Sequence, residues 1–130
     1  MNRDVIEVAG FSDLLRRKNI PLSPAIRANG FVFVSGTPPI DLATGEFIVG
    51  DIQRQTEQCM ICVRTVLEAA GSSLEKICKV VIYATDSSQY GAINDVYGRF
   101  FKSAPPARSF VPVGRWPLAF DLEIECVALA

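Results

Sequence analysis

The chain has 130 residues, a net charge of −1, and 49% hydrophobic against 21% charged residues. These values predict one compact, soluble domain spanning residues 1–130, which would bury roughly two-thirds of its unfolded surface. The longest basic run is Arg16-Arg17-Lys18, so we expect a solvated surface there and no nucleic-acid binding. Because no leader-like or membrane-length apolar stretch occurs, a cytoplasmic protein without membrane contact is the default expectation.

The sequence contains no histidine, which excludes Ser-His-Asp and Cys-His mechanisms and nearly every catalytic zinc site. Any chemistry must come from carboxylates, arginine, lysine, tyrosine, serine, cysteine or backbone groups. Cys59 and Cys62 form a lone C-x-x-C inside a helical pattern, whereas Cys78 and Cys126 lie in apolar, strand-like runs. Without a second pair at zinc-site spacing, we expect all four to be buried free thiols in a reducing compartment.

The first half of the chain shows short strands and then a helical period. Three strands are expected, at 5–8, 25–28 and 31–35. Asn29-Gly30 is typical of a two-residue hairpin turn, and prolines and glycines then predict a loop that turns back on itself over 38–46. Apolar residues at helical spacing predict a helix over 51–70, with Asp51 as its N-cap and Gly71 just past its end.

The second half predicts one more helix and three more strands. A continuous apolar run indicates a strand over 78–84. A helix is expected over 88–102, ended by two prolines, with its inward face formed by Tyr90, Ile93, Tyr97, Phe100 and Phe101. Closing strands are expected at 109–113 and 120–129, and Pro112 predicts that the first of them is an edge strand or a bulged strand. The order β-β-β-α-β-α-β-β predicts an α+β domain with two helices packed on one face of a mixed sheet.

Two residues of the last third are the leading candidates for chemistry. Arg108 follows the stiff turn Pro105-Pro106-Ala107, and a fixed guanidinium binds small carboxylates in fork geometry. Glu123 lies in an otherwise apolar run, so its carboxyl should have a raised pKa and could transfer protons or position a water molecule. Together they predict a pocket for a small anionic substrate.

Each of these residues also has a structural interpretation. Arg108 could satisfy buried carbonyl groups, and Glu123 could form an interface salt bridge with an arginine. Glu125 has the same parity along the strand as Glu123, so either glutamate could face the pocket.

A series of short motifs resembles, in the same order, those of the Rid (reactive intermediate deaminase, or YjgF) family. The resemblance runs from about residue 21 to the end of the chain. The motifs are Ser35-Gly36, Pro39-Ile40-Asp41, Thr44-Gly45-Glu46, Gln55-Thr56, Glu68-Ala69-Ala70-Gly71, Asn94-Asp95-Val96-Tyr97, Pro106-Ala107-Arg108-Ser109 and Glu123-Ile124-Glu125. This resemblance implies a chorismate-mutase-like fold, a homotrimer whose sheets wrap into a barrel, and ligand sites in the clefts between subunits.

The resemblance also implies an activity. Such proteins hydrolyse small enamine and imine acids such as 2-aminoacrylate to a 2-keto acid and ammonia, with neither metal nor cofactor. By motif match, Arg108 would bind the substrate carboxylate and Glu123 would position or activate the attacking water. Ser35 and Asn94 would line or brace the cleft, although each could equally serve to bond a nearby backbone group.

The chain departs from the RidA-like pattern at two places. Leu22, in Pro21-Leu22-Ser23-Pro24, stands where enamine-hydrolysing members carry a tyrosine, and Trp116-Pro117 replaces a Leu-Pro pair. These changes imply a divergent member with a more apolar pocket, lined by Leu22, Trp116 and Phe120, although packing explains Trp116 equally well. Two other functions stay open: a trimeric small-carboxylate-binding or regulatory protein with little turnover, and a ribonuclease, which the slightly acidic composition disfavours.

Overall fold

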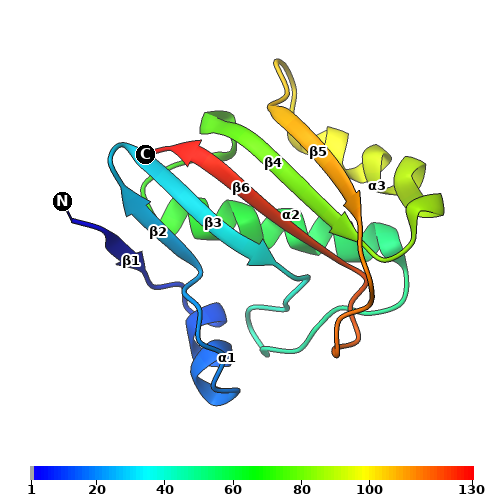
Figure 1. Ribbon diagram of the computed structural model, residues 1–130, viewed down its shortest axis with the longest axis horizontal. Coiled ribbons are helices and arrows are strands. Elements are labelled where there is room, and N and C mark those ends of the chain that lie inside the picture. The colour runs from blue at the N-terminus through cyan, green and yellow to red at the C-terminus, as the bar shows by residue number, and fades with distance from the viewer. Residues whose placement is uncertain (1) are drawn as a thin grey trace.

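The computed structural model describes residues 2–130 and confirms the α+β class (Figure 1). The strands in this part of the chain are β1 (Asp4–Ile6), β2 (Ala25–Ala28), β3 (Phe31–Thr37), β4 (Ile77–Ala84), β5 (Ala107–Pro112) and β6 (Leu122–Leu129). The α-helices are α1 (Phe11–Arg17), α2 (Ile52–Ala69) and α3 (Tyr90–Tyr97), with 3₁₀ turns at Leu74–Lys76, Ser87–Gln89 and Gly98–Phe100. None of these helices is long and apolar enough to cross a membrane.

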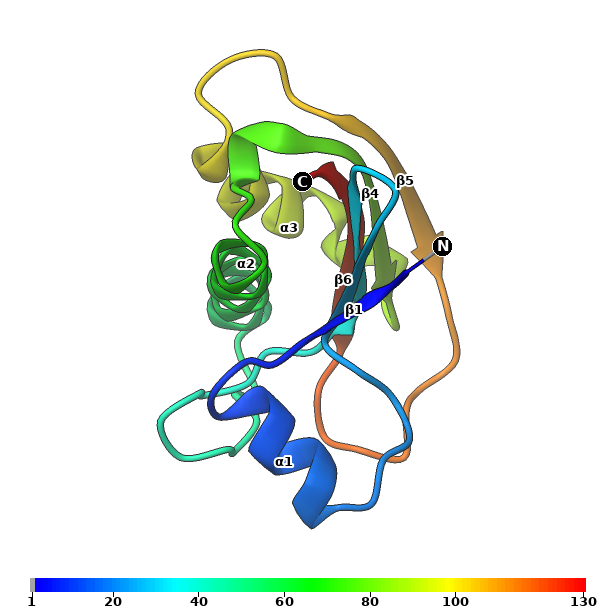
Figure 2. The ribbon, with the colours of Figure 1, turned by 90° about the vertical axis from the view of Figure 1, so that its left-hand side faces the viewer.

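The strands form one mixed sheet in the order β1-β2-β3-β6-β4-β5. Only β4 and β5 pair in parallel among the described strands. Pro112 ends the edge strand β5, as predicted, where its missing N–H disturbs no ladder. The sheet seen edge-on in Figure 2 has α2 and α3 on one side, which confirms that two helices pack on one face. We call this the helix face and the opposite one the bare face.

The long helix α2 forms where the sequence predicts it. The Asp51 side chain accepts a hydrogen bond from the Gln53 backbone N–H at 3.0 Å, and Gly71 follows the end with φ +80°. A buried stripe on α2 packs against β3 and β6. The predicted loop also turns back on itself, because Ile40 forms an antiparallel bridge with Phe47.

Three of the four thiols are buried and free, as expected, but Cys78 is exposed. The β4–β6 register shifts between Ile77 and Lys79, and the extra residue of this bulge turns Cys78 outward. Burial raises the pKa of the Cys62 thiol to about 11 and that of Cys126 to about 12, so both stay protonated and unreactive at neutral pH.

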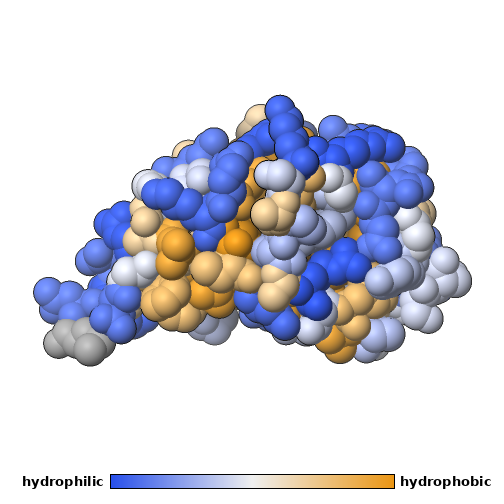
Figure 3. Space-filling model, turned by 90° about the horizontal axis from the view of Figure 1, so that it is seen from above, coloured by the Kyte–Doolittle hydropathy of each residue, from blue (hydrophilic) through white to orange (hydrophobic). Residues whose placement is uncertain are grey.

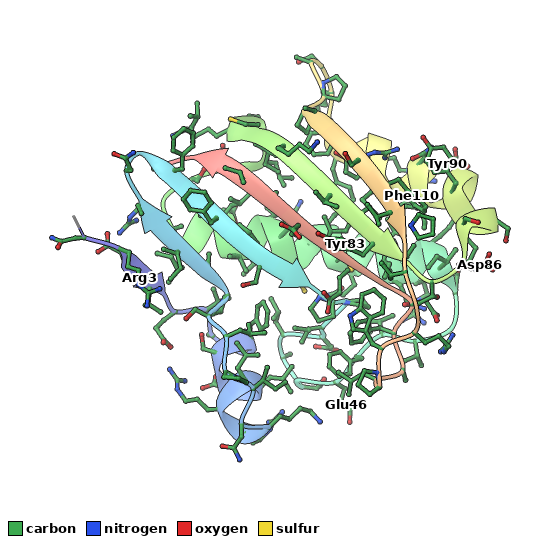
Figure 4. All side chains as sticks on the ribbon, in the orientation of Figure 1. Arg3, Glu46, Tyr83, Asp86, Tyr90 and Phe110 are labelled. Atoms are coloured by element: carbon green, nitrogen blue, oxygen red, sulfur yellow. The ribbon has the colours of Figure 1, made fainter. Side chains whose placement is uncertain are left out.

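The second predicted helix is shorter than expected. Its α-helical part is Tyr90–Tyr97, and a 3₁₀ turn continues on either side. Ile93 and Tyr97 are buried as predicted, but Tyr90 is 46% exposed, which corrects its assignment to the core. Tyr90 begins α3 and lies beside the edge strand β5 in Figure 4, at the margin of the sheet.

The sequence analysis missed α1, a helix of seven residues between β1 and β2. Two turns are too short to display a repeated apolar period. The helix is nevertheless well anchored, since Phe11, Leu14 and Leu15 are buried. At its start, the Val8 N–H donates to the Ser12 hydroxyl at 2.9 Å.

Gly10, which precedes α1, cannot carry a side chain without strain. Its φ is +85°, and a Cβ there would lie 2.2 Å from the Leu42 carbonyl oxygen. We expect Gly10→Ala to lower the free energy of unfolding by at least about 1–3 kcal/mol, measured by urea denaturation. Gly114→Ala is the matched control, because nothing lies within 4 Å of its Cβ position. Equal midpoints for the two variants would contradict this account of the α1 junction.

Candidate active site

Arg108 lies on β5 and points toward α3 on the helix face. Its guanidinium carbon is 4.9 Å from the centre of the Tyr97 ring and 5.6 Å from that of Tyr90. One terminal nitrogen donates a hydrogen bond to the Tyr90 hydroxyl at 3.2 Å. The Tyr90 ring in turn packs nearly perpendicular to Phe110, with ring centres 4.9 Å apart (Figure 4). The arginine is therefore held by aromatic rings through cation–π contacts.

The charge of Arg108 has no anionic partner within residues 2–130. No carboxylate lies within 4.0 Å of its guanidinium there. The structural interpretation required the Arg108 side chain to donate to backbone carbonyls, and it donates to none among these residues. Its one side-chain hydrogen bond, to the Tyr90 hydroxyl, leaves most of its N–H donors without a partner among the described residues. Such a group is suited to bind a small carboxylate in fork geometry.

Two polar atoms on α3 are buried without a hydrogen-bond partner among the described residues. They are the Asn94 Oδ1 and the Tyr97 hydroxyl, one helical turn apart. Burial raises the pKa of Tyr97 to about 12 against the opposing effect of Arg108, so the hydroxyl stays neutral. Buried polar groups normally find partners, and these two therefore favour a site that a ligand, water or second chain completes.

Glu123 lies on β6 and faces the bare side of the sheet. Its carboxylate rests on Gly36, where an added Cβ would lie 2.5 Å from Oε1. Burial, and secondarily the charge of Glu125, raises the pKa of Glu123 to about 7. No cation pairs with it within the described residues. The pKa of Glu123 is therefore raised, as its position in an apolar strand led us to expect.

Glu125 shares the face of Glu123 but is occupied. It accepts a hydrogen bond from the Tyr83 hydroxyl at 2.5 Å. Glu123 is accordingly the free carboxyl of the two. Among residues 2–130, no three His, Cys, Asp or Glu side chains are grouped so as to hold a metal ion.

A cavity of about 70 Å³ lies beside Glu123, and its lining is otherwise almost entirely apolar. Leu22 and Phe120 line this cavity, and their place in a substrate pocket stays a prediction. Trp116 does not reach it and stacks behind Phe120, with ring centres 5.0 Å apart. The Ser35 hydroxyl donates to the Ser23 carbonyl at 2.6 Å and so fixes the loop that carries Leu22. Ser35 thus bonds a nearby backbone group, which is the structural alternative that the sequence left open.

Arg108 and Glu123 do not meet within one chain. Arg108 pairs with Val80 of β4, and Glu123 pairs with Tyr83 of the same strand. Since successive residues of a strand face opposite sides, Val80 and Tyr83 project from opposite faces of the sheet. The pocket predicted from this pair is therefore not formed by a single chain, and a ligand that touches both residues needs a second copy.

The bare face offers a surface for such a copy. Large apolar side chains are exposed along it, and they are Val5, Phe31, Phe33, Val111 and Leu129. Hydrophobic side chains also reach the surface in the view of Figure 3. An exposed apolar face of this kind marks an interaction surface.

Two contributors to these sites were not predicted from the sequence. One is α1, which supplies Phe11, Leu14 and Leu15 to the cavity wall. These three residues have the i, i+3 and i+4 spacing of a helix, but two turns are too short for that spacing to be distinctive. The other is Tyr90, which was placed in the core because its spacing fitted the inward stripe of the helix.

The raised pKa of Glu123 predicts a cost to stability at alkaline pH. Below about pH 5 this carboxyl is protonated in the folded chain, whereas above about pH 8 it is charged and partly buried. Because the folded pKa is above the unfolded one, its contribution to stability falls as pH rises between these values. We expect Glu123→Gln to raise the melting temperature at about pH 8.5 but hardly at about pH 5, by differential scanning calorimetry. An equal shift at both pH values would contradict the raised pKa.

Known proteins resemble this chain over most of its length. Residues 17–130 match the family model described as Endoribonuclease L-PSP. The chain is a member of the L-PSP, or Rid, family. A RutC family protein of Pyrococcus horikoshii is 43% identical over 108 residues, covering 83% of this chain and 86% of the relative. The chloroplastic Reactive Intermediate Deaminase A of Arabidopsis thaliana is 35% identical, covering 83% of this chain and 58% of that protein.

Solved structures of the L-PSP/Rid family have the same fold. The Rid family protein YyfA of Yersinia pestis has a TM-score of 0.87 at 35% identity, covering 99% of this chain and 100% of that one. TdcF of E. coli, solved with bound serine, has a TM-score of 0.79 at 34% identity, covering 85% and 88% of the two chains. The resemblance to the Rid family stated from the sequence motifs is confirmed.

Proposed function

We propose that this L-PSP/Rid protein is a metal- and cofactor-free hydrolytic deaminase of small enamine and imine acids. Glu123 carries the proposal, because it is a carboxyl with pKa about 7 beside an apolar cavity, with no ionic partner in the described part of the chain. A group that exchanges its proton near neutrality suits a reaction that both adds and removes protons. Arg108 supplies the complementary function, because its guanidinium is held by aromatic rings and pairs with no carboxylate among the same residues.

The reaction needs little beyond orientation and proton transfer. An enamine such as 2-aminoacrylate first takes a proton from solvent at C3, which gives the iminium form. Water then bonds to C2 while Glu123 accepts one of its protons. The C2–N bond breaks as Glu123 returns that proton to nitrogen, so ammonia leaves, and the remaining hydroxyl releases its proton to solvent as the C=O bond of the 2-keto acid forms. Holding the carboxylate on Arg108 and one water on Glu123 supplies the required geometry.

The proposed active assembly is a homotrimer with its sites between subunits. Arg108 and Glu123 project from opposite faces of one sheet, so a substrate between them takes the arginine from one copy and the glutamate from another. The apolar bare face gives the copies a surface to bury. A closed ring then repeats the same mixed site at each interface.

Two of the relatives support this reading. One carries the name Reactive Intermediate Deaminase A, and TdcF holds serine, a small molecule with the carboxylate that Arg108 would bind. The relative named Reactive Intermediate Deaminase A is chloroplastic, so the cytoplasmic location of this chain stays a prediction.

The direct test generates 2-aminoacrylate in the cuvette and follows its disappearance with and without the protein. We expect the purified protein to accelerate the loss well above the spontaneous rate, and to release 2-keto acid and ammonia in equal amounts. Hydrolysis at the spontaneous rate would contradict the proposal. Calorimetry with 2-keto acids would then identify the alternative, a trimeric carboxylate binder, by tight binding without turnover.

A ribonuclease activity is the second candidate, because the matching family model is described as an endoribonuclease. The net charge of −1 provides no basic surface to attract RNA. RNA cleavage that survives purification to constant specific activity and disappears in Glu123→Gln would support this function. Cleavage that is lost on purification would remove it.

A further inference from the structure

We propose that Tyr90 is a positioning residue of the carboxylate site: it fixes the Arg108 guanidinium and leaves it one way to pair with a substrate carboxylate. The inference rests on the proposed deaminase function and adds a residue to it. Tyr90 lies outside the motifs that carry the family resemblance. It takes no part in the bond changes of the hydrolysis and acts only through Arg108.

Two tyrosine rings of α3 hold the guanidinium between them. Tyr90 and Tyr97 are the first and last residues of this helix, two turns and about 10 Å apart along its axis. The guanidinium carbon of Arg108 lies 5.6 Å from the first ring centre and 4.9 Å from the second, so it lies between the two turns. Both contacts are cation–π attractions, and together they restrain the end of a long side chain.

The hydroxyl of Tyr90 limits where a carboxylate can bind. A guanidinium offers two forks of paired N–H groups, one formed by Nε and Nη2 and the other by the two terminal nitrogens. Nη2 contributes one N–H to each fork, and it donates a hydrogen bond to the Tyr90 hydroxyl at 3.2 Å. One fork of Arg108 is therefore engaged by an oxygen of the protein itself. A substrate carboxylate can use both of its oxygens only at the other fork.

Phe110 supports the Tyr90 ring from the sheet. Arg108 and Phe110 are alternate residues of β5, so both lie on the helix face. The rings of Phe110 and Tyr90 are nearly perpendicular, at 83°, with centres 4.9 Å apart, and Figure 4 shows the two side chains close together. This edge-to-face contact holds Tyr90 next to the guanidinium.

Tyr90 and Tyr97 differ in burial, which separates their roles. Tyr97 is 6% exposed and belongs to the core, whereas Tyr90 is 46% exposed. The Tyr97 side of the guanidinium is therefore closed, and a substrate reaches Arg108 from the side of Tyr90. Because Tyr90 buries little apolar area, its replacement should leave the fold stable.

A single open fork gives the substrate a single orientation. The carboxylate carbon is bonded to C2, so the direction of the fork fixes the direction in which C2 points. In the proposed trimer, C2 must meet the water that Glu123 of a second copy holds. A guanidinium free to rotate would hold the carboxylate in several orientations, of which only some present C2 to that water.

The test compares two Tyr90 variants with wild type on 2-aminoacrylate. Tyr90→Phe removes only the hydroxyl and should lower kcat/KM about three- to tenfold. Tyr90→Leu removes the ring as well and should lower it further, by about 30-fold in all. Phe100→Leu is the matched control, because the Phe100 ring contacts Arg64 and not Arg108, and it should leave kcat/KM unchanged. No loss in Tyr90→Phe, or an equal loss in Phe100→Leu and Tyr90→Leu, would overturn the inference.

A second background separates positioning from structural support. A lysine has no fork to restrict, so in Arg108→Lys the added Tyr90→Phe substitution should lower kcat/KM less than about twofold. Equal losses in the two backgrounds would show that Tyr90 acts independently of Arg108 and would overturn the inference.

Binding of pyruvate separates this inference from the deaminase proposal. If wild type does not accelerate hydrolysis, the deaminase proposal fails, and calorimetry with pyruvate tests Tyr90 on the same set of proteins. A Kd raised about three- to tenfold in Tyr90→Phe, but less than about twofold when Arg108→Lys is already present, would support the role of Tyr90. An unchanged Kd, or no binding of pyruvate to wild type, would overturn it.

Discussion

Replacing Arg108 by alanine is expected to lower kcat/KM for a small 2-imino acid by roughly 10²- to 10³-fold. The guanidinium is held by Tyr90 and Tyr97 and pairs with no carboxylate among residues 2–130, so the substrate would supply its anion. Because the carboxylate is bound both before and during the reaction, most of the loss should appear in KM.

Two further substitutions separate the effect of the Arg108 geometry from the effect of its charge. Arg108→Lys keeps the charge but loses the two-pronged geometry, and its kcat/KM should lie between wild type and alanine. Arg99→Ala removes an exposed arginine of the Gly98–Phe100 turn and should leave the kinetics unchanged. A loss as large in Arg99→Ala as in Arg108→Ala would show that general charge, and not the held guanidinium, attracts the substrate.

Replacing Glu123 by glutamine is expected to lower kcat by roughly 10²- to 10⁴-fold, because the amide cannot take a proton from water. In the wild-type enzyme the ionised carboxylate is the active form, so kcat/KM should rise with pH through about 7. Glu125→Gln is the matched control. It removes the neighbouring charge that raises the pKa of Glu123, so the rising limb should move to lower pH with activity largely retained.

The Glu123 prediction has a clear contrary result. A pH profile that is flat between about pH 5 and 9, together with full activity in Glu123→Gln, would remove the carboxylate from the reaction. The same variant should be more stable than wild type at alkaline pH, so a loss of activity cannot be attributed to unfolding.

The parts of the fold with strong local signals could be predicted from the sequence. The helix expected over 51–70 forms as Ile52–Ala69, because eighteen residues give several turns of apolar period and both ends carry capping signals. The hairpin at Asn29-Gly30 forms as well, with both residues at positive φ. The short helix α1 and the bulge at Cys78 could not be predicted, since neither has a local pattern long enough to recognise.

The environment of Glu123 could be predicted from the sequence, but the arrangement of the candidate residues could not. The apolar run around Glu123 correctly indicated a raised pKa, which is a property of the immediate environment. The relation of Arg108 to Glu123 depends on the register of β5 and β6 with β4, which lies between them. Local sequence does not encode that register, and a shift of one residue would reverse which face each side chain occupies.

The choice between Glu123 and Glu125 also required tertiary structure. Both lie on the bare face of β6 two residues apart, and the alternation of side chains along a strand does not distinguish them. The difference comes from Tyr83 on the neighbouring strand, whose hydroxyl occupies Glu125. Gly36 on the other side leaves room for the Glu123 carboxylate.

In the proposed trimer, each active site combines Arg108 of one subunit with Glu123 of another. The most direct test of this arrangement is to unfold and refold an equal mixture of Arg108→Ala and Glu123→Gln, each nearly inactive alone. In randomly mixed trimers, three in four contain both variants and each of these rebuilds one of its three sites, so about one quarter of wild-type activity should return. A mixture no more active than the sum of the two separate variants would contradict the claim.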